Sequence, residues 1–418
     1  MAENTLPASQ RRIVILGGSY GGVSTAHYLL KHAVPHLPNK DSYQVILVSP
    51  SKQAMCRPAC PRALISDEMF AQDKLFVSIQ KAFEQYPKDS FSFIHGTATE
   101  LDHNNRTVSI SLSTGNSEKL DFYALVIATG ASTPSPLFSL NRDENFLRES
   151  WTAFRKALPN AKSIVIGGGG PAGVETAGEL GEFLNGRAGW FSSKLENPKV
   201  SITVVTAASQ ILPLLRPSIA HKAETLLGKV GVTVIKNVRI KNVLPDGAGT
   251  DIVATKATVT LKDGKTLDAD LYIPAMGMKP NTSFVSETLL TSDGRVETNP
   301  TTFRVDKAGL RIYAVGDVAS AARPAVHNIL GAIPVLCTNI KRDLLLDSGK
   351  QKSSVGEDRE FKEDTREMQL VPIGKSKGVG AGMGYQVPSF FVWLIKGRDY
   401  WLWSVGNLWS GKQWAKES

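Results

Sequence analysis

Apolar residues along the chain form short runs that end at glycines, which is the pattern of strands in a parallel sheet. The clearest run covers residues 12–16 (RIVIL), followed by Gly17-Gly18 and a helical periodicity over residues 23–30. The same order recurs at residues 163–166 (SIVI), with glycines and a helical stretch over residues 174–184. Strand, glycine turn and helix open a nucleotide-binding βαβ unit. The sequence therefore predicts an α/β fold with two Rossmann-like, doubly wound domains.

Each unit is followed by an apolar run that can serve as the second strand of its sheet. These runs cover residues 44–48 (QVILV) and 200–205 (VSITVV). Residues 91–112 alternate between apolar and polar positions around a small turn, which indicates paired strands. Residues 347–366 are rich in charge, serine and glycine, so they are expected to form a solvated linker. Three further buried strands are expected, at residues 122–128, 269–274 and 310–315.

The composition is that of a globular chain, with 418 residues, 42% of them hydrophobic and 21% charged. Three cysteines favour a reducing compartment and argue against a disulfide framework. The net charge of +9 is spread without a run of five lysines or arginines, so nucleic-acid binding is not expected. None of the seven histidines stands at metal-ligand spacing from cysteine or carboxylate, so no metal site is expected.

The sequence also bears on where the protein resides. No apolar run is long enough to span a bilayer, and residues 1–12 lack the apolar stretch of a secretory signal. Ala2 stands where N-myristoylation would need a glycine. We therefore expect a cytoplasmic protein, with peripheral attachment to an intracellular membrane left open.

Two glycine motifs open the predicted helices. The second reads Gly168-x-Gly170-x-x-Gly173, whose glycines permit a tight turn, close approach of a pyrophosphate and close packing of helix on strand. The first, residues 17–22 (GGSYGG), carries Ser19 where the middle glycine belongs. Serine is small and can donate a hydrogen bond to a phosphate. Both motifs therefore predict dinucleotide sites, and a glycine turn without ligand is the plain alternative.

Neither unit carries the acidic residue that usually binds the adenosine ribose at the end of the second strand. The first unit ends Val48-Ser49-Pro50, where Ser49 could make a weaker contact. The second ends Thr206-Ala207-Ala208, which also lacks the arginine that would bind the 2′-phosphate of NADPH. The sequence therefore leaves the choice between NADH and NADPH open.

Five motifs in this order resemble the pyridine-nucleotide:disulfide oxidoreductase superfamily. Besides the glycine motifs they are Ala128-Thr129-Gly130, the GxxPN turn at residues 277–281 and the GD motif Gly316-Asp317. The strings GVETAGEL and RIYAVGD and the C-terminal tail look most like the apoptosis-inducing-factor-like branch, which includes ferroptosis suppressor protein. Type II NADH:quinone dehydrogenases are more distantly similar. The resemblance implies FAD in the first unit and NADH or NADPH in the second.

By that resemblance the FAD domain is discontinuous and the C-terminal segment is α+β. Glu175 is expected near the nicotinamide and ribose, and Asp317 at the ribityl or pyrophosphate part of FAD. The plain alternatives are an exposed carboxylate in a helix's first turn for Glu175 and a helix N-cap for Asp317. The expected boundaries are 11–150 and 278–346 for the FAD domain, 151–277 for the NAD(P)H domain, 347–366 for the linker and 367–418 for the C-terminal segment. The residues expected to hold the cofactors are Gly17, Gly18, Ser19, Gly21, Gly22, Ser49, Ala128, Thr129, Gly130, Gly168, Gly170, Gly173, Glu175, Gly316 and Asp317.

Cys56 and Cys60 bear on the path of the electrons. Disulfide-reducing members of the superfamily relay hydride through two cysteines spaced C-x4-C on a helix. Here the spacing is C-x3-C, and Pro58 and Pro61 would disrupt a helix. We expect buried thiols rather than a redox disulfide, with direct electron transfer from the reduced flavin to an acceptor.

The C-terminal segment bears on the acceptor, because five of the seven tryptophans lie in residues 393–414 with lysines and arginines between them. This composition is typical of a segment at a membrane interface, but the tryptophans could equally be core residues of a cover over the flavin domain. By resemblance, Lys396 matches a family lysine near the flavin ring and Trp401 an aromatic lining the acceptor pocket. These two are the candidate catalytic residues.

The sequence therefore predicts an FAD-dependent NAD(P)H oxidoreductase that reduces a quinone-type or other small-molecule acceptor. Two alternatives stay open. One is a soluble FAD-dependent oxidoreductase acting on a specialised metabolite, and the other is a signalling or nucleic-acid-binding flavoprotein. A homodimer is compatible with each of them.

Overall fold

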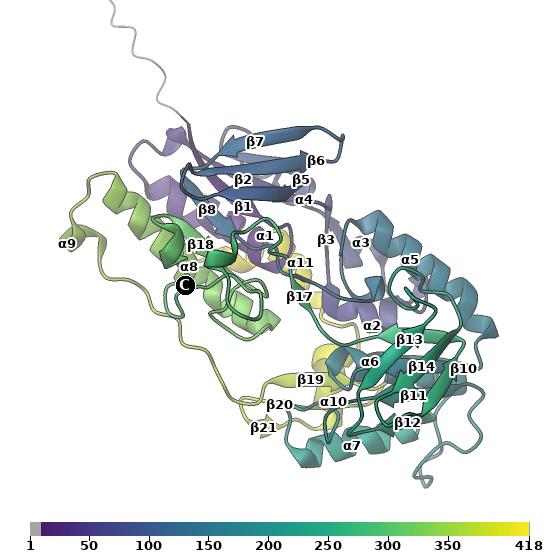
Figure 1. Ribbon diagram of the computed structural model, residues 1–418. Helices are drawn as coiled ribbons and strands as arrows, with labels where there is room; N and C mark the ends of the chain where they lie inside the picture. Colours follow the sequence, from purple (N-terminus) through teal and green to yellow (C-terminus); the bar gives the residue numbers. More distant parts are fainter. Residues whose placement is uncertain (1–9, 418) are drawn as a thin grey trace, which may run out of the picture.

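The computed structural model describes residues 10–417 and contains two main sheets, each flanked by helices (Figure 1). Residues 1–9, on which the expectations about a signal and about Ala2 rest, lie outside the described residues. The first sheet has the order β18 (Ile312–Ala314), β8 (Ala124–Ile127), β1 (Arg11–Leu16), β2 (Tyr43–Ser49), β5 (Phe91–Asp102), β6 (Thr107–Leu112) and β7 (Ser117–Asp121). The second has the order β12 (Val232–Ile235), β11 (Ser201–Val205), β10 (Ser163–Gly167) and β16 (Leu271–Pro274). The first sheet is parallel from β18 to β5 and continues into the antiparallel strands β6 and β7, and the second sheet is parallel throughout.

The two glycine motifs lie where each sheet's first strand meets its helix. In the first unit β1 leads into α1 (Tyr20–Tyr28), and in the second β10 leads into α6 (Pro171–Asn185). Strands β1 and β10 each lie between two parallel neighbours and are almost entirely buried, as the continuous apolar runs predict. The prediction of two doubly wound α/β units is confirmed.

The late strand β18 pairs with β8 of the first sheet, although more than 180 residues separate them in the chain. The chain therefore leaves the first unit, builds the second and returns, as a discontinuous domain does. Two short antiparallel pairs accompany these crossings. They are β9 (Ala131–Ser132) with β17 (Lys279–Pro280) and β3 (Gln53–Met55) with β4 (Phe76–Ser78).

Helices and a small sheet complete the two units. A three-stranded antiparallel sheet of β13 (Ile240–Leu244), β14 (Ala257–Leu261) and β15 (Thr266–Ala269) adjoins the second unit. The longer helices are α5 (Glu144–Ala157), α7 (Pro217–Gly228) and α8 (Val326–Asp347), and α8 packs along α1. The short helices are α2 (Cys60–Ala63), α3 (Gln72–Leu75), α4 (Ile79–Phe83) and α9 (Lys352–Val355).

The segment expected to be a solvated linker is fastened to the first unit along part of its length. Arg304 forms ion pairs with Asp343 of α8 and with Asp358, at 2.7 and 2.8 Å. The rings of Phe303 and Phe361 pack with centroids 5.0 Å apart. Charge and serine content indicated exposure, but these contacts hold the second half of residues 347–366 against the protein.

The C-terminal segment mixes strands and helices and lies between the two units (Figure 1). It contains β19 (Gln369–Pro372), β20 (Gly378–Gly382), β21 (Tyr385–Gln386), α10 (Ser389–Val392) and α11 (Leu402–Trp409). Its final turns are clamped to α1 and the π-helical turn that follows. The clamp consists of hydrogen bonds donated by His27 Nε2 to Trp409 O (2.9 Å), by Lys31 Nζ to Gly411 O (2.6 Å) and by His32 Nε2 to Trp414 O (2.8 Å).

Candidate functional site

The two glycine turns have nearly the same geometry. Gly17 and Gly168 both adopt the left-handed region, with φ of 120° and 122°. A Cβ on Gly17 would lie 2.2 Å from the Ala128 carbonyl oxygen, and one on Gly168 would lie 2.5 Å from that of Ala275. Only glycine fits such a turn, because the φ value and the neighbouring strand both exclude a side chain.

The last glycine of each motif holds the helix against its turn. A Cβ on Gly22 would lie 1.7 Å from the carbonyl oxygen of Gly17, and one on Gly173 would lie 2.0 Å from that of Gly168. The helix therefore begins directly above the turn, with its N–H groups facing the space beyond the strand. That space is where a pyrophosphate is bound in this type of unit.

Ser19 departs from the motif but takes a position with room for a side chain. The equivalent residue in the second unit is Gly170, and a Cβ there would have no protein atom within 4 Å. Ser19 is the N-cap residue of α1, yet its side chain caps no backbone N–H of that helix. Its hydroxyl is therefore free to bond a phosphate, and the first motif fits a dinucleotide despite the substitution.

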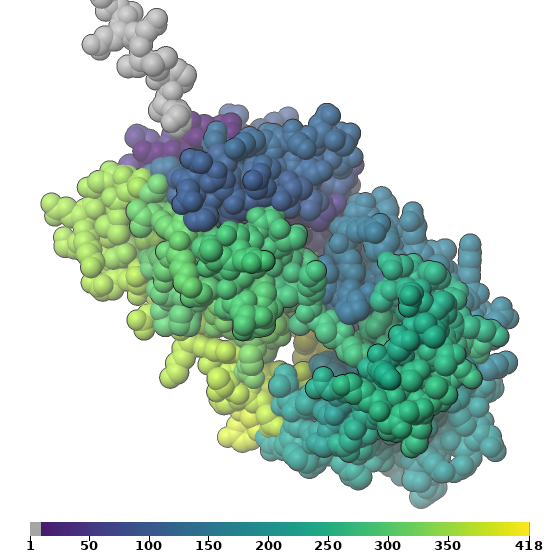
Figure 2. Space-filling model, viewed as in Figure 1, coloured from purple at the N-terminus to yellow at the C-terminus, as the bar shows by residue number. Residues whose placement is uncertain are grey.

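One continuous cavity of about 1610 Å³ connects the two glycine turns. Figure 2 shows the surface hollowed between the two units. A cavity of this size, with a helix N-terminus at each of two sites, fits two dinucleotides. The predicted residues that line it are Gly17, Gly18, Ser19, Gly21, Ser49, Ala128, Thr129, Gly130, Gly170, Glu175, Gly316, Asp317 and Lys396. Those outside its lining are Gly22, Gly168, Gly173 and Trp401.

Asp317 belongs to the cavity wall and not to a helix terminus. It lies in a turn after β18, and the next helix, α8, begins only at Val326. The N-cap alternative is therefore wrong. Its carboxylate pairs with the Arg57 guanidinium at 3.2 Å, and the same guanidinium group donates to the Ala131 carbonyl and contacts the Met278 sulfur. Arg57 thus joins three segments around the cavity. No pattern in the sequence had pointed to this residue.

Glu175 and Lys396 form a buried ion pair on the cavity wall. Their exposed fractions are 3% and 6%, and Lys396 Nζ donates to Glu175 Oε1 at 2.5 Å and to the Leu370 carbonyl at 3.1 Å. Burial raises the pKa of Glu175 to about 7, and the charge of Lys396 opposes that rise. The exposed-carboxylate alternative for Glu175 is therefore wrong, because the C-terminal segment covers this face of α6.

A second buried pair lies one helical turn further along α6. Arg62 of α2 donates two hydrogen bonds to the Glu179 carboxylate, at 2.9 and 2.7 Å, and Tyr400 donates a third at 3.0 Å. Glu175 and Glu179 share a helix face because they are four residues apart. That spacing is visible in GVETAGEL. Lys396 was expected near the flavin by resemblance, but nothing in the sequence paired it with Glu175 or pointed to Arg62.

Trp401 stands beside this cluster. The Lys396 ammonium lies 5.0 Å from the centre of its indole ring, within cation–π range. Tyr400 and Trp401 both adopt the left-handed region, with φ of 53° and 68°. Such backbone costs roughly 1–3 kcal/mol per residue, so packing against the Arg62 and Lys396 pairs holds it in place.

Comparison with known proteins identifies the family. The pattern of the pyridine nucleotide-disulphide oxidoreductases matches residues 11–334. The chain belongs to this family. Oxidoreductase phnG of Penicillium herquei is 68% identical over 419 residues, covering 100% of both chains. Ferroptosis suppressor protein 1 of Mus musculus is 27% identical over 400 residues, covering 93% of this chain and 92% of that protein.

Solved structures share the fold of this chain. The structure of NDH2 from Plasmodium falciparum in complex with NADH superposes with a TM-score of 0.64 at 15% identity, covering 97% of this chain and 100% of that one. By its family this chain is an FAD-dependent oxidoreductase that uses NADH or NADPH. FAD supplies the hydride-accepting chemistry when it is bound. The expectation of an FAD- and nicotinamide-dependent enzyme is confirmed.

The family name refers to a disulphide, but the cysteines of this member are poorly suited to that role. Cys56, Cys60 and Cys337 are free and buried. Burial raises the pKa of Cys56 to about 11, and it also raises the pKa of Cys60. The prolines divide the region into a 3₁₀ turn at Arg57–Ala59 and the single turn of α2. The expectation of buried thiols is confirmed.

The tryptophans of the C-terminal segment divide between core and surface. Trp409 and Trp414 are buried against α1 and its continuation, whereas Trp403 is 60% exposed. Within residues 10–417 no helix is long and apolar enough to cross a membrane. Both interpretations of the segment thus keep support, one from the buried tryptophans and one from the exposed apolar side chains Phe390, Phe391, Leu394, Ile395 and Trp403.

Proposed function

We propose that this enzyme passes hydride from NADH or NADPH through FAD to a quinone-type acceptor without a cysteine relay. The observation that carries the proposal is the state of the two cysteines nearest the cavity. Their thiols are buried and keep their protons at neutral pH, so a thiolate relay is unavailable. The reduced flavin must then meet its acceptor directly.

We assign Glu175 and Lys396 to the meeting point of the two cofactors, because both line the cavity between the glycine turns. Glu175 would accept hydrogen bonds from the nicotinamide ribose. Lys396 would hold that carboxylate in place and present positive charge to the flavin edge, where negative charge develops on reduction. Trp401, whose ring centre lies 5.0 Å from the Lys396 ammonium, is outside the cavity lining and would bound the acceptor pocket from behind Lys396.

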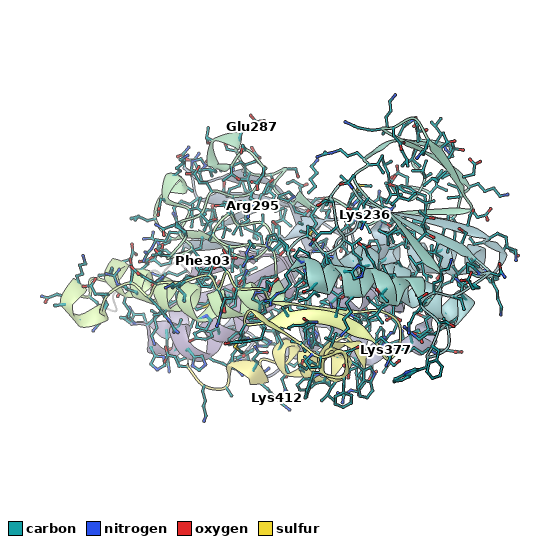
Figure 3. The ribbon with its side chains drawn as sticks, turned by 90° about the horizontal axis from the view of Figure 1, so that it is seen from below. Lys236, Glu287, Arg295, Phe303, Lys377 and Lys412 are labelled. Atoms are coloured by element: carbon teal, nitrogen blue, oxygen red, sulfur yellow. The ribbon has the colours of Figure 1, made fainter. Side chains whose placement is uncertain are left out.

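We propose that the C-terminal segment rests on a membrane surface. An apolar acceptor is compatible with this placement. Phe390, Phe391 and Trp403 are each about half exposed or more, in a chain whose net charge is +9. Figure 3 shows Lys377 and Lys412 along the side occupied by this segment. Aromatic rings with lysines beside them suit the interface of an anionic bilayer.

A second candidate is a soluble oxidoreductase that acts on a specialised metabolite. It is favoured by one observation, the much higher identity to oxidoreductase phnG than to ferroptosis suppressor protein 1. Both candidates use the same cofactors and the same cavity, and they differ only in the acceptor.

An acceptor panel separates the two candidates. NADH and NADPH should each be tested with ubiquinone analogues, ferricyanide and polycyclic quinones, with and without vesicles containing phosphatidylserine. Efficient ubiquinone reduction and vesicle flotation that falls in Phe390→Ser/Phe391→Ser support the first candidate. Leu310→Ser, an even more exposed apolar site on the first unit, is the control. Turnover of only the polycyclic acceptors, with no flotation, favours the second.

A further inference from the structure

A carboxylate reaches the end of β2 from a distant helix. Glu144, the first residue of α5, accepts hydrogen bonds at Oε2 from Ser51 Oγ at 2.7 Å and from the Lys52 backbone N–H at 3.2 Å. Ser51 lies two residues beyond β2, close to where this type of unit usually carries the acid that binds the adenosine ribose. The chain has Ser49 at the strand end and no acid of its own there.

The loop that Glu144 meets is anchored by buried residues, although Lys52 itself is exposed. Ser49 and Ser51 are 3% and 2% exposed, and Ser49 Oγ accepts a hydrogen bond from the Ser51 N–H at 3.2 Å. Between them the Pro50 carbonyl accepts a hydrogen bond from His95 Nε2 of β5 at 2.9 Å. All four residues line the cavity on the side of the first glycine turn. This wall is therefore preorganised for a ligand.

The start of α5 belongs to the same wall. Asn141, Arg142 and Asp143 line the cavity, and Glu144 follows directly after them, just outside the lining. Asp143 caps the helix by accepting a hydrogen bond from the Phe146 N–H at 2.9 Å. The cap fixes the first turn and hence the direction of Glu144. Within residues 10–417 both hydrogen bonds to Glu144 are made at Oε2, so Oε1 remains available as an acceptor.

The second unit provides an internal comparison. Thr206 Oγ1 accepts a hydrogen bond from the Ala208 N–H at 3.3 Å, which repeats the arrangement of Ser49 and Ser51. The residue equivalent to Ser51 is Ala208, which has no hydroxyl group. In the described part of the chain no carboxylate bonds to residues 206–209. The carboxylate at the strand end is thus specific to the first unit.

We propose that Glu144 takes the place of the missing strand-end acid and accepts hydrogen bonds from the adenosine ribose hydroxyls of FAD, with Ser49 and Ser51 beside it. The inference rests on the assignment of FAD to the first unit. It adds α5, outside the βαβ motif, to the residues that select FAD. It also explains how the cofactor site functions although β2 ends without an acid.

The test is equilibrium binding of FAD to the apoprotein, followed by quenching of flavin fluorescence. Glu144→Gln keeps the shape of the side chain but removes its charge, so FAD should bind roughly tenfold more weakly. Glu149→Gln is the matched control, because Glu149 is exposed on the same helix and should leave the affinity unchanged.

A second flavin distinguishes recognition from support of the fold. The wild type should bind FAD made from 2′,3′-dideoxyadenosine more weakly than FAD, whereas Glu144→Gln should bind the two nearly equally. Equal weakening of both flavins by Glu144→Gln would show that Glu144 only braces the β2–β3 loop, and the proposal would be overturned. Failure of the wild type to bind FAD at all would instead refute the placement of FAD in the first unit.

Discussion

Glu175 and Lys396 are 221 residues apart in the chain and meet as a buried ion pair where the second unit contacts the C-terminal segment. Neither α6 nor the C-terminal segment could bury its charged side chain without the other. The helix that follows the second glycine turn is thereby tied to the segment that covers it, so under the proposed function the binding of the nicotinamide and the packing of that segment would depend on the same contact.

Removing one partner of this pair should be strongly destabilising. Lys396→Met leaves the Glu175 carboxylate buried without a cation, which costs about 3–5 kcal/mol in comparable pairs. The double variant Glu175→Gln/Lys396→Met should lose less than the sum of the single losses, because no charge is then buried. Urea unfolding of the wild type, Glu175→Gln, Lys396→Met and the double variant measures this coupling. The exposed Lys377→Met is the control. Additive losses would mean that the two side chains do not interact.

One added methyl group in either glycine motif should disable the dinucleotide site of that motif and leave the other site intact. Gly22→Ala would force a Cβ against the Gly17 carbonyl oxygen and should leave purified protein without flavin. Gly173→Ala, which meets the carbonyl oxygen of Gly168, should retain flavin but lose its reduction by NADH or NADPH. Absorbance near the flavin band, before and after addition of nicotinamide, checks both. The reverse pattern would exchange the assignments of FAD and the nicotinamide to the two units. Ser19→Gly should change neither the flavin content nor its reduction.

The thiols should be inert while the protein is folded. Because burial raises the pKa of Cys56 to about 11, iodoacetamide at neutral pH should label Cys56 far more slowly in the native protein than in urea. Cys56→Ser/Cys60→Ser should keep most acceptor reduction, measured with a quinone and with ferricyanide. Loss of acceptor reduction, with flavin reduction intact, would restore the dithiol route.

Acid should weaken the clamp between α1 and the C-terminal segment. Burial lowers the pKa of His27 from 6.5 to about 4, so the unfolded chain takes up a proton on this residue at a higher pH than the folded protein. Stability should therefore fall as the pH drops from 6.5 towards 4, by about 3 kcal/mol if the full shift is expressed. The thermal midpoint of His27→Gln should show a smaller change over this range. An identical pH profile for both proteins would contradict the assignment.

Much of the fold could be predicted because it is encoded locally. Buried parallel strands need continuous apolar runs, and left-handed turns need glycines such as Gly17 and Gly168, so the βαβ units are visible in the sequence. The bounds of their strands and helices in the structure differ from the predicted bounds by a few residues. The proline-interrupted region around Cys56 was also predictable, since proline limits where a helix can begin.

The charge network could not be predicted because its partners are distant in the chain. Arg57 meets Asp317 and Arg62 meets Glu179 only after the units have packed together. Glu144 likewise reaches the end of β2 through tertiary structure alone. The sequence identified most residues on the glycine turns and, by resemblance, Lys396. Nothing in it paired Glu175 or Glu179 with a cation or brought Glu144 to the end of β2.

The clamp of His27, Lys31 and His32 on residues 409–414 has a consequence for biosynthesis. The first helix leaves the ribosome long before its partners exist, since His27 and Trp409 are 382 residues apart. Until residues 409–414 emerge, the polar atoms of the clamp and the part of the helix surface that these residues cover stay exposed, which is a state prone to aggregation. A nascent chain should therefore depend on holding chaperones almost to the end of translation, and a late frameshift should yield insoluble protein.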